Sequence, residues 1–419
     1  MKRIVLAIVL ASCLSLEGWA TGYQALLQGN RELGMGNLGV ALRPTASSVY
    51  WNPGALGFMG YNSVQAGVTF AGSKHHYRPL WSGSDLSQYE ASTDSPVGTP
   101  FHVYATFGGE NSDFRFGLGV YTPFGSSVKW EDGWDGRGYL TEMSLKTFFF
   151  QPTVSYKISD KFSVGAGFVL ATGSVNLQKD ITQLGDGATS EIDGSAELGY
   201  GYNIGVSYRP NEQWILGLSY KSEVTMKVED GDAIFNVPMA AKPLFQADKW
   251  SSELPMPSTW AFGVTYLPTS KLSIGAEVNL VGWDSYEKLD IEFNKPVNGE
   301  THSVSNRNYN KSYVIKIGGE YQLKEWLSVR AGGYYDKSPV DAGYLSPETP
   351  DQSRINTTFG VGLKPTKNIA VDLAFLYSNG IEREQTPKDV EGAGNVGGVL
   401  PGTFKTTGLI GGISVSYNF

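Results

Sequence analysis

Hydrophobic and polar residues alternate along most of this chain, and the pattern is clearest at its end. The segment Ile413–Phe419 reads Ile-Ser-Val-Ser-Tyr-Asn-Phe. A β-strand points successive side chains to opposite faces, so this segment has one apolar and one polar face. Such strands, ending on an aromatic residue, are typical of transmembrane β-barrels, whose outer face meets lipid and whose inner face lines the lumen.

The same alternation predicts about fourteen strands, an even number that suits a bacterial outer-membrane barrel. They cover 64–70, 101–107, 114–120, a segment ending at 156, 162–168, 202–208, 214–220, 260–266, 272–280, 313–321, 327–331, 357–363, 369–377 and a last strand ending at Phe419. Short turns alternate with long loops, one of which follows the third strand as far as about Ser144. We therefore expect an all-β fold, a fourteen-stranded antiparallel transmembrane β-barrel. A large soluble β-sandwich shares the alternation and is disfavoured by the rhythm of the connections.

Charged residues on the polar strand faces are expected to point into the lumen, because a charge facing lipid at the bilayer midplane costs ~2–4 kcal/mol. Both signs occur, which predicts ion pairs across a packed interior. The residues are Arg115, Lys221, Glu223, Glu277, Lys316, Glu320, Arg330, Asp336 and Asp372.

Composition agrees with a barrel. The 419 residues include 52 Gly, 23 Tyr, 20 Phe and 10 Trp, which suits strands, tight turns and interfacial aromatic belts. The mean hydropathy of −0.20 is too polar for a helical membrane protein but fits a wall that is apolar at every second residue. With 33 basic and 41 acidic side chains and no dense basic patch, a nucleic-acid partner is not expected.

The amino-terminus has the features of an export signal. Lys2 and Arg3 precede an apolar run, and Gly18-Trp19-Ala20 offers small residues for cleavage, so residues 1–20 are expected to be a signal peptide. Acylation of Cys13, the only cysteine, is the alternative processing route. No later segment reaches the ~18 apolar residues of a spanning helix, so the chain is expected in the outer membrane of a Gram-negative cell.

Residues 21–61 do not follow the strand pattern. Their loose helical spacing of apolar residues is broken by glycines, and Asn52-Pro53-Gly54 is a strong turn signal. The apolar content predicts an N-terminal hatch (plug) folded inside the lumen, ahead of a barrel at 62–419. A periplasmic extension is the alternative.

Several motifs resemble those of the FadL family of outer-membrane transporters for long-chain fatty acids and hydrocarbons. They are Gly22-Tyr23-Gln24, Gly34-Met35-Gly36, Asn52-Pro53-Gly54, Tyr121-Thr122-Pro123-Phe124-Gly125, Tyr220-Lys221-Ser222-Glu223 and, most specific, the run from Arg330 through Tyr335–Val340 to Pro350–Arg354. The resemblance covers the mature chain. It implies a monomeric barrel with a hatch in the lipopolysaccharide-bearing membrane, without cofactor or enzymatic activity.

The resemblance also implies a route for hydrophobic small molecules such as fatty acids and hydrocarbons. They lodge in an extracellular groove, pass to an inner pocket at Tyr23 and Lys179, and leave sideways through a wall opening at a kinked third strand. The kink falls on Pro123, Phe124 and Gly125; Pro123 has no amide hydrogen to give to a ladder, and Gly125 permits unusual torsions. In the hatch turn, Gly54 stands where the family has Ala, and this change is expected to matter little.

The loop after the seventh strand is unusually apolar for an extracellular segment. Exposed apolar patches of this kind usually mark binding surfaces, so this loop is expected to form the outer groove. Its candidate residues are Ile234, Phe235, Val237, Met239, Leu244, Phe245 and Trp250. The preceding loop, 176–197, is short and polar for the family.

Other chemistry finds little support in the sequence. The sequence has four histidines, His75, His76, His102 and His302. The neighbouring pair His75-His76 has no paired acidic cluster, so no metal site is expected. No Gly-x-Ser-x-Gly element occurs. An outer-membrane lipid hydrolase and a general diffusion porin remain the alternative functions.

Overall fold

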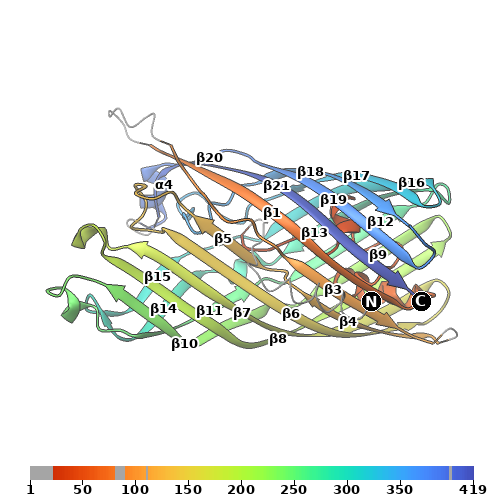
Figure 1. Ribbon diagram of the computed structural model, residues 1–419, viewed down its shortest axis with the longest axis horizontal. Helices are drawn as coiled ribbons and strands as arrows, with labels where there is room; N and C mark the ends of the chain where they lie inside the picture. Colours follow the sequence, from red (N-terminus) through yellow and green to blue (C-terminus); the bar gives the residue numbers. More distant parts are fainter. Residues whose placement is uncertain (1–21, 81–89, 110–111, 396–398) are drawn as a thin grey trace.

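The computed structural model describes residues 22–80, 90–109, 112–395 and 399–419, and shows a closed antiparallel barrel (Figure 1). The predicted signal peptide and Cys13 lie outside the described residues. Fourteen strands form the wall, which confirms the predicted fold class. They are β1 (Ser63–Pro79), β3 (Phe101–Phe107), β4 (Phe114–Tyr121), β6 (Glu142–Lys157), β7 (Phe162–Asp180), β8 (Thr189–Asn211), β9 (Trp214–Lys221), β12 (Thr259–Tyr266), β13 (Leu272–Val281), β16 (Ser312–Lys324), β17 (Leu327–Asp336), β18 (Arg354–Leu363), β19 (Ile369–Gly380) and β21 (Gly402–Asn418).

Each wall strand pairs with the next, and the last closes the cylinder on the first. The register of β1 with β21 runs without interruption from Ser63–Asn418 to Pro79–Gly402. Closure removes the free sheet edges, so the wall strands satisfy one another's backbone polar groups within lipid.

The remaining elements lie in the hatch and in the connections. They are the helices α2 (Asn30–Leu33), α3 (Ser48–Trp51), η1 (Pro53–Phe58), η3 (Thr182–Leu184), η4 (Lys242–Leu244), η5 (Trp283–Ser285) and α4 (Pro387–Gly392), and the strands β2 (Ala91–Ser92), β5 (Gly125–Lys129), β10 (Val224–Asn236), β11 (Lys249–Met256), β14 (Lys288–Val297), β15 (Glu300–Asn306) and β20 (Arg383–Gln385). No helix within the described ranges is long and apolar enough to cross a membrane.

The two ends of the barrel differ in their connections. Turns such as 158–161 and 212–213 are short and lie at the right end of Figure 1, where the last strand also ends. Long connections, including the hairpins β10–β11 and β14–β15, project at the left end. By the rule for outer-membrane barrels the right end is periplasmic and the left end extracellular.

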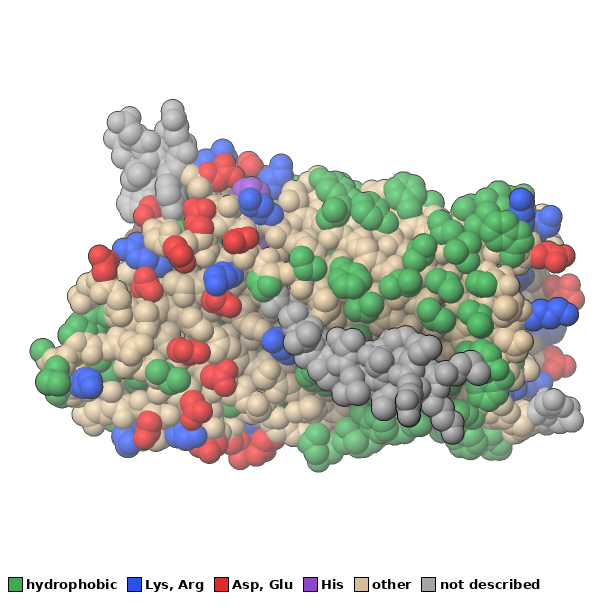
Figure 2. All heavy atoms as spheres, in the orientation of Figure 1, with side chains coloured by type: hydrophobic (Ala, Val, Ile, Leu, Met, Phe, Trp, Pro, Cys, Tyr) green, Lys and Arg blue, Asp and Glu red, His purple; other side chains and the backbone are tan. Residues whose placement is uncertain are grey.

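The strands extend beyond the predicted segments at the extracellular end. β7 continues to Asp180 rather than ending near 168, and β8 begins at Thr189 rather than near 202. Figure 2 shows why: apolar side chains cover the wall toward the periplasmic end, whereas charged side chains replace them on the extracellular part. Alternation that depends on contact with lipid disappears once the strands leave the membrane.

The inner face is polar, as expected from the charged positions. Lys316 pairs with Glu277 at 2.8 Å, and Arg330 pairs with both Glu320 and Asp372 at 2.6 Å. Arg115 and Asp336 are also buried, and Lys221 lies over the ring of Tyr50 at 4.2 Å. Glu223 differs, because it is exposed where β9 gives way to β10.

Residues 22–62 fill the lumen ahead of β1. The helix η1 packs against β6, β7 and β8, while α2 packs against β18, β19 and β21. Almost all side chains of this segment are buried, which is what the lumen requires of a plug. We call this segment the hatch.

Candidate binding cavity and wall opening

The barrel encloses an apolar cavity near its extracellular end, which we call the main cavity. It has about 850 Å³ of space free of protein atoms, part of which opens to solvent. Strands β6, β7, β8, β10 and β11 contribute most of its lining, because their inward positions carry aliphatic side chains here. The lining includes Leu145, Leu177, Ile192, Met226, Val228 and Leu254.

One end of the main cavity is polar. The guanidinium of Arg307 is buried, donates to Ser346 at 2.7 Å and lies 3.5 Å from the carboxylate of Glu348. Its Nε is buried without a hydrogen-bond partner among the described residues. Burial alone would lower the pKa of Arg307, but Tyr286 and Glu348 outweigh it and raise the pKa above its ordinary value. A cation therefore borders a mostly aliphatic space.

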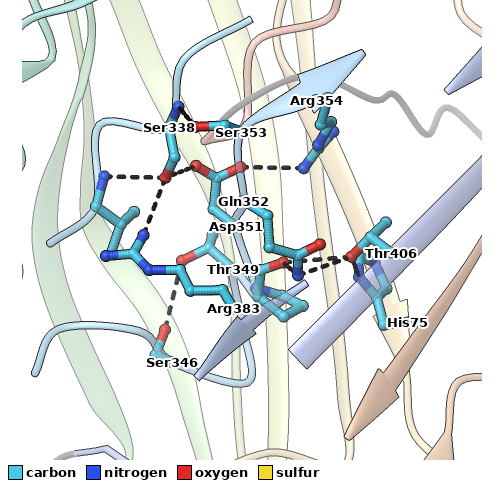
Figure 3. A network of polar contacts seen from close by, with 12 residues as sticks. His75, Ser338, Ser346, Thr349, Asp351, Gln352, Ser353, Arg354, Arg383 and Thr406 are labelled. Carbon is cyan, nitrogen blue, oxygen red and sulfur yellow. Dashed lines mark hydrogen bonds and ion pairs between the residues drawn. The ribbon is translucent and has the colours of Figure 1, made fainter. Parts of the chain in front are cut away.

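The connection from β17 to β18 brings Glu348 and Thr349 to this cavity. A buried polar network fixes it (Figure 3): the carboxylate of Asp351 accepts from Ser338 at 2.6 Å and from Arg354 at 3.0 Å. Farther along, Gln352 donates to Thr406, whose hydroxyl contacts His75. The most specific motif of the sequence thus holds a cavity wall in place.

The third wall strand is interrupted beside the main cavity. In β4 the register with β6 places Tyr121 opposite Phe149, and in β5 it places Gly125 opposite Lys146. Residues 122–124 therefore lie opposite only two residues of β6, Thr147 and Phe148. The third wall strand has one residue more than its partner at this point. β5 keeps the register with β6 but not that with β3, whose ladder ends at the pair His102–Tyr121.

The interrupted residues exchange backbone hydrogen bonds with the hatch, while the side chain of Thr147 in β6 bonds to Phe124 N and O. Ala25 N donates to Pro123 O at 2.7 Å, and Gly125 N donates to Tyr23 O at 2.9 Å. Phe124 forms an isolated bridge with Gln24, so the strand bends inward onto the amino-terminal segment. The structure thus places the predicted residues Pro123, Phe124 and Gly125 at an inward break of the wall.

Tyr23 lies between two cavities. Its ring lines the main cavity and stands 6.3 Å from that of Phe124. Beyond Phe124 lies a small cavity of about 420 Å³, lined by Gln24, Tyr121, Pro123, Val224 and Met256, among others. Tyr23 and Phe124 together separate the main cavity from this small cavity beside the wall break.

Lys179 is placed differently from Tyr23. It lies near the end of β7, opposite Ser190 of β8, and the main cavity is lined by Val175 and Leu177 of the same strand rather than by Lys179. Because side chains alternate along a strand, Lys179 is on the same inward face as Leu177, two residues farther toward the extracellular end.

The predicted outer-groove residues lie in different surroundings. Trp250 is buried and lines the main cavity, while Phe235 and Phe245 pack together at 5.3 Å in the β10–β11 hairpin. Ile234, Met239 and Leu244 are exposed, Met239 to 83 %. Val237 is half-buried. The structure does not bring these residues together in one groove.

The hatch turn is anchored to the wall. The amide of Asn52 donates to Val40 O at 2.6 Å and to Val206 O at 3.0 Å, and its oxygen accepts from Gly54 N. The expectation that Gly54 is interchangeable with Ala is wrong for this chain, because a Cβ there would lie 2.5 Å from Gly205 O. Pro53, which follows Asn52, opens the helix η1.

Sequence reasoning missed Arg307 and the aliphatic residues of β10. Arg307 follows a hairpin that carries no motif, so no sequence signal connected it with the lumen. Met226 and Val228 do alternate with polar residues in the stretch that was read as a loop, and this was the signal available.

Taken together, the closed barrel, the hatch in its lumen and the apolar cavity above the hatch define an outer-membrane β-barrel protein that is plugged by its own amino-terminal segment. The family profile described as outer membrane protein transport protein (OMPP1/FadL/TodX) matches residues 11–419. The chain belongs to this family, and its place is the outer membrane.

Known proteins resemble the chain over nearly its full length. An outer membrane protein of Neisseria meningitidis is 24 % identical over 96 % of this chain and 95 % of its own. A long-chain fatty acid transport protein of Escherichia coli is 22 % identical over 94 % and 93 %.

Solved structures share the fold. A Pseudomonas aeruginosa FadL homologue superposes with a TM-score of 0.79 at 18 % identity, covering 95 % of this chain and 99 % of the homologue. The Pseudomonas putida toluene transporter TodX gives 0.70 at 16 % identity, covering 97 % and 99 %.

Proposed function

We propose that this protein carries hydrophobic compounds passively into the outer membrane, binding them in the main cavity and releasing them sideways at the break in the third strand. The observation that carries the proposal is the inward bend of residues 122–124 onto the hatch, beside the small cavity that Pro123 and Phe124 line. Relatives named for long-chain fatty acid and for toluene transport support the class of cargo.

Binding in the main cavity needs no specific polar contact. Each buried methylene favours an apolar site by ~0.8 kcal/mol, so an acyl chain lying along Leu145, Leu177 and Val228 gains affinity with its length. The polysaccharide layer outside the membrane excludes such molecules, and a protein cavity gives them a path through it.

Release depends on the amino-terminal segment. Residues 23–25 hold the bent strand through two backbone hydrogen bonds, and Tyr23 with Phe124 divides the main cavity from the small cavity. A displacement of this segment joins the two cavities and frees the edge of β5. The cargo then reaches the bilayer without crossing the polar lumen below the hatch.

Arg307 favours a cargo with an anionic head. A buried guanidinium with an unused Nε can donate to a carboxylate, and hydrogen bonds to charged groups contribute about 1.5–3 kcal/mol. We propose a carboxylate at Arg307 with its hydrocarbon tail among the aliphatic lining. Lys179, suggested by the family resemblance, is the competing position for the same head group.

Uptake into proteoliposomes whose outer leaflet is lipopolysaccharide tests the function, with oleate, toluene and sucrose as probes and protein-free liposomes of the same composition as the baseline. Uptake of oleate or toluene without sucrose supports the proposal. Sucrose flux contradicts it in favour of a diffusion porin, and release of fatty acid from phospholipid contradicts it in favour of a lipid hydrolase.

Binding of oleate by charge variants tests the head-group site. Arg307→Lys keeps the charge and loses the planar fork, so we expect oleate affinity to fall by about 10-fold or more, with toluene affinity unchanged. Lys179→Met is the matched comparison. A fall for Lys179→Met alone would move the head group to that lysine.

The exposed apolar residues of the β10–β11 hairpin remain our candidates for first capture. Met239 and Leu244 lie at its tip, away from the cavity lining. Replacing both with Ser should slow uptake at low probe concentration and leave the affinity of the main cavity unchanged. Unchanged uptake would exclude this hairpin from capture.

A further inference from the structure

Lys221 is a cation inside the barrel whose charge is not matched by a carboxylate. It is the last residue of β9, where the register places it opposite Asn203 of β8 and Thr259 of β12. Among the described residues, its ammonium pairs with no carboxylate and donates no hydrogen bond. It lies instead over two rings of the hatch, 4.2 Å from that of Tyr50 and 5.8 Å from that of Trp51. Ring faces attract a cation, but they do not neutralise it.

Lys316 shows how the barrel matches a lysine elsewhere on its inner wall. Its ammonium pairs with Glu277 at 2.8 Å and also donates to a hatch carbonyl. Glu277 attracts Lys221 from farther away, but both of its oxygens are already bonded, one to Lys316 and one to two hatch amides. Enclosing an unmatched charge is unfavourable, so the surroundings of Lys221 favour an anion that completes it.

Lys221 lines the small cavity beside the wall break. It is the one charged residue among the described residues of that lining, and Glu223, two positions on, does not belong to it. Gln24 and Thr259 add polar groups, since the Gln24 amide donates to the Thr259 hydroxyl at 3.5 Å. The other lining side chains are mostly apolar or aromatic, among them Tyr121, Phe124, Phe149, Val169, Val224 and Met256.

The position of the small cavity gives this cation a use in transport. In the proposed release route, the cargo passes from the main cavity through the small cavity to the break at 122–124. A carboxylate that leaves Arg307 along this route enters a mostly apolar space, where an ion without a partner is strongly disfavoured. Lys221 is the group that can pair with the carboxylate there.

We propose that Lys221 is a second head-group site, which binds the carboxylate of a fatty acid in the small cavity after the head group has left Arg307. The Thr259 hydroxyl, which accepts from Gln24, can donate to the second carboxylate oxygen. This inference rests on the proposed function and names the cargo for which the wall break is built, namely lipids with a carboxylate head. A neutral hydrocarbon needs no partner in the small cavity, so Lys221 matters for the charged cargo alone.

Two probes with the same tail test the proposal, oleate and its uncharged ester methyl oleate. Their uptake is measured in the lipopolysaccharide-bearing proteoliposomes, with the unmodified protein and with Lys221→Met, which keeps the length of the side chain and removes its charge. We expect the initial rate for oleate to fall at least tenfold and the rate for methyl oleate not to fall. An unchanged oleate rate, or an equal fall for both probes, overturns the proposal. Absence of uptake of both probes by the unmodified protein contradicts the proposed function instead.

A control variant separates head-group binding from a clamp on the hatch, the other role open to Lys221. Tyr50→Leu removes the nearer ring and keeps the ammonium. We expect the ratio of oleate to methyl oleate uptake to stay within twofold of that of the unmodified protein. If Tyr50→Leu loses oleate uptake as selectively as Lys221→Met does, the contact with the hatch is what matters and the head-group role is overturned.

A covalent trap reports on the contact itself. Oleate is added to the full protein together with a hydrophobic carbodiimide, which activates the carboxylate so that a lysine in contact with it forms an amide and a urea is released. We expect mass spectrometry to find the oleoyl amide on Lys221. Absence of this amide in a protein that takes up oleate overturns the proposal, and an amide on Lys179 in its place assigns the head group to that lysine.

Discussion

Glu277 is a wall residue that holds the hatch directly, through hydrogen bonds to its backbone. Its Oε2 accepts from Gly39 N at 2.8 Å and from Val40 N at 2.9 Å. Its Oε1 pairs with Lys316, which in turn donates to Asn37 O at 2.9 Å. Both side chains are almost completely buried, at 2 % and 0 % exposure.

Replacing Glu277 with Ala removes two direct hatch contacts and leaves Lys316 buried without its carboxylate. Breaking a buried ion pair by removing one partner costs about 3–5 kcal/mol. If that cost falls on the hatch-closed state, the population with a displaced hatch rises by roughly a hundredfold to several thousandfold, since 1.4 kcal/mol is about one factor of ten. We therefore expect ion-conducting openings in planar bilayers that the unmodified protein does not show.

Two further variants separate a displaced hatch from a weakened barrel. Asp372→Asn breaks a buried pair between wall strands, so it should lower the melting temperature without adding conductance. In Glu277→Ala/Lys316→Met the unpaired charge is gone, so much of the thermal stability should return, while conductance stays high because Gly39 and Val40 remain unbonded. A Glu277→Ala protein with wild-type conductance and a lowered melting temperature would refute the role assigned to the hatch contacts.

Three other predictions follow from single contacts. Gly54→Ala forces a Cβ against Gly205 O and should lower the melting temperature by several degrees, while Gly392→Ala, at a position with open space, should not; equal melting temperatures would contradict the close packing of the hatch turn. Asp351→Asn weakens bonds to Ser338 and Arg354 and should cost about 1.5–3 kcal/mol in chemical unfolding together with reduced oleate binding; unchanged unfolding would show that the network in Figure 3 does not hold the loop. In the extracellular hairpin β14–β15, His302 donates a hydrogen bond to the carboxylate of Asp290, which raises the pKa of His302 above its ordinary value. This contact therefore stabilises the hairpin fully below the ordinary pKa of His302 and is lost as the pH rises through the raised pKa. NMR titration should show this pKa falling in Asp290→Asn, and an unchanged value would contradict the contact.

The wall strands were predictable because contact with lipid requires apolar side chains at their outward positions. Where a strand contacts the bilayer, every second residue must be apolar, as in Ile413–Phe419. β7 and β8 extend beyond the bilayer, where their outer face contacts water instead of lipid. Only packing inside the lumen then constrains their side chains, so the alternation of apolar and polar residues ends before the strands do. The same reason explains why the hairpins β10–β11 and β14–β15 were read as loops.

The break in the third strand was recognisable from Pro123 and Gly125, but its continuation was not. After Gly125 the sequence continues with two serines, so β5 carries too little alternation to be read as a strand, and a loop was predicted there. The bonds that hold the break come from the hatch, more than ninety residues earlier in the chain, and no local pattern records them.

Arg307 shows the same limit for the site. A lone arginine after a polar hairpin has no local signal of function. It reaches the cavity through distant contacts, because Arg307 N donates to Glu287 O and Tyr309 N donates to Tyr286 O. Lys179 was chosen because it falls where the family has a basic pocket residue. In the structure it lies two residues beyond Leu177, just outside the lining of the main cavity.

Deletion of Pro123 tests the lateral route most directly. Because 122–124 are one residue too many for β6, removing one residue restores the register of β4 through β5 and should straighten the strand. We expect a folded barrel that still binds oleate in the main cavity but takes it up at least tenfold more slowly. Wild-type oleate uptake by a deletion variant whose third strand is shown to be straight would contradict release through the wall at this point.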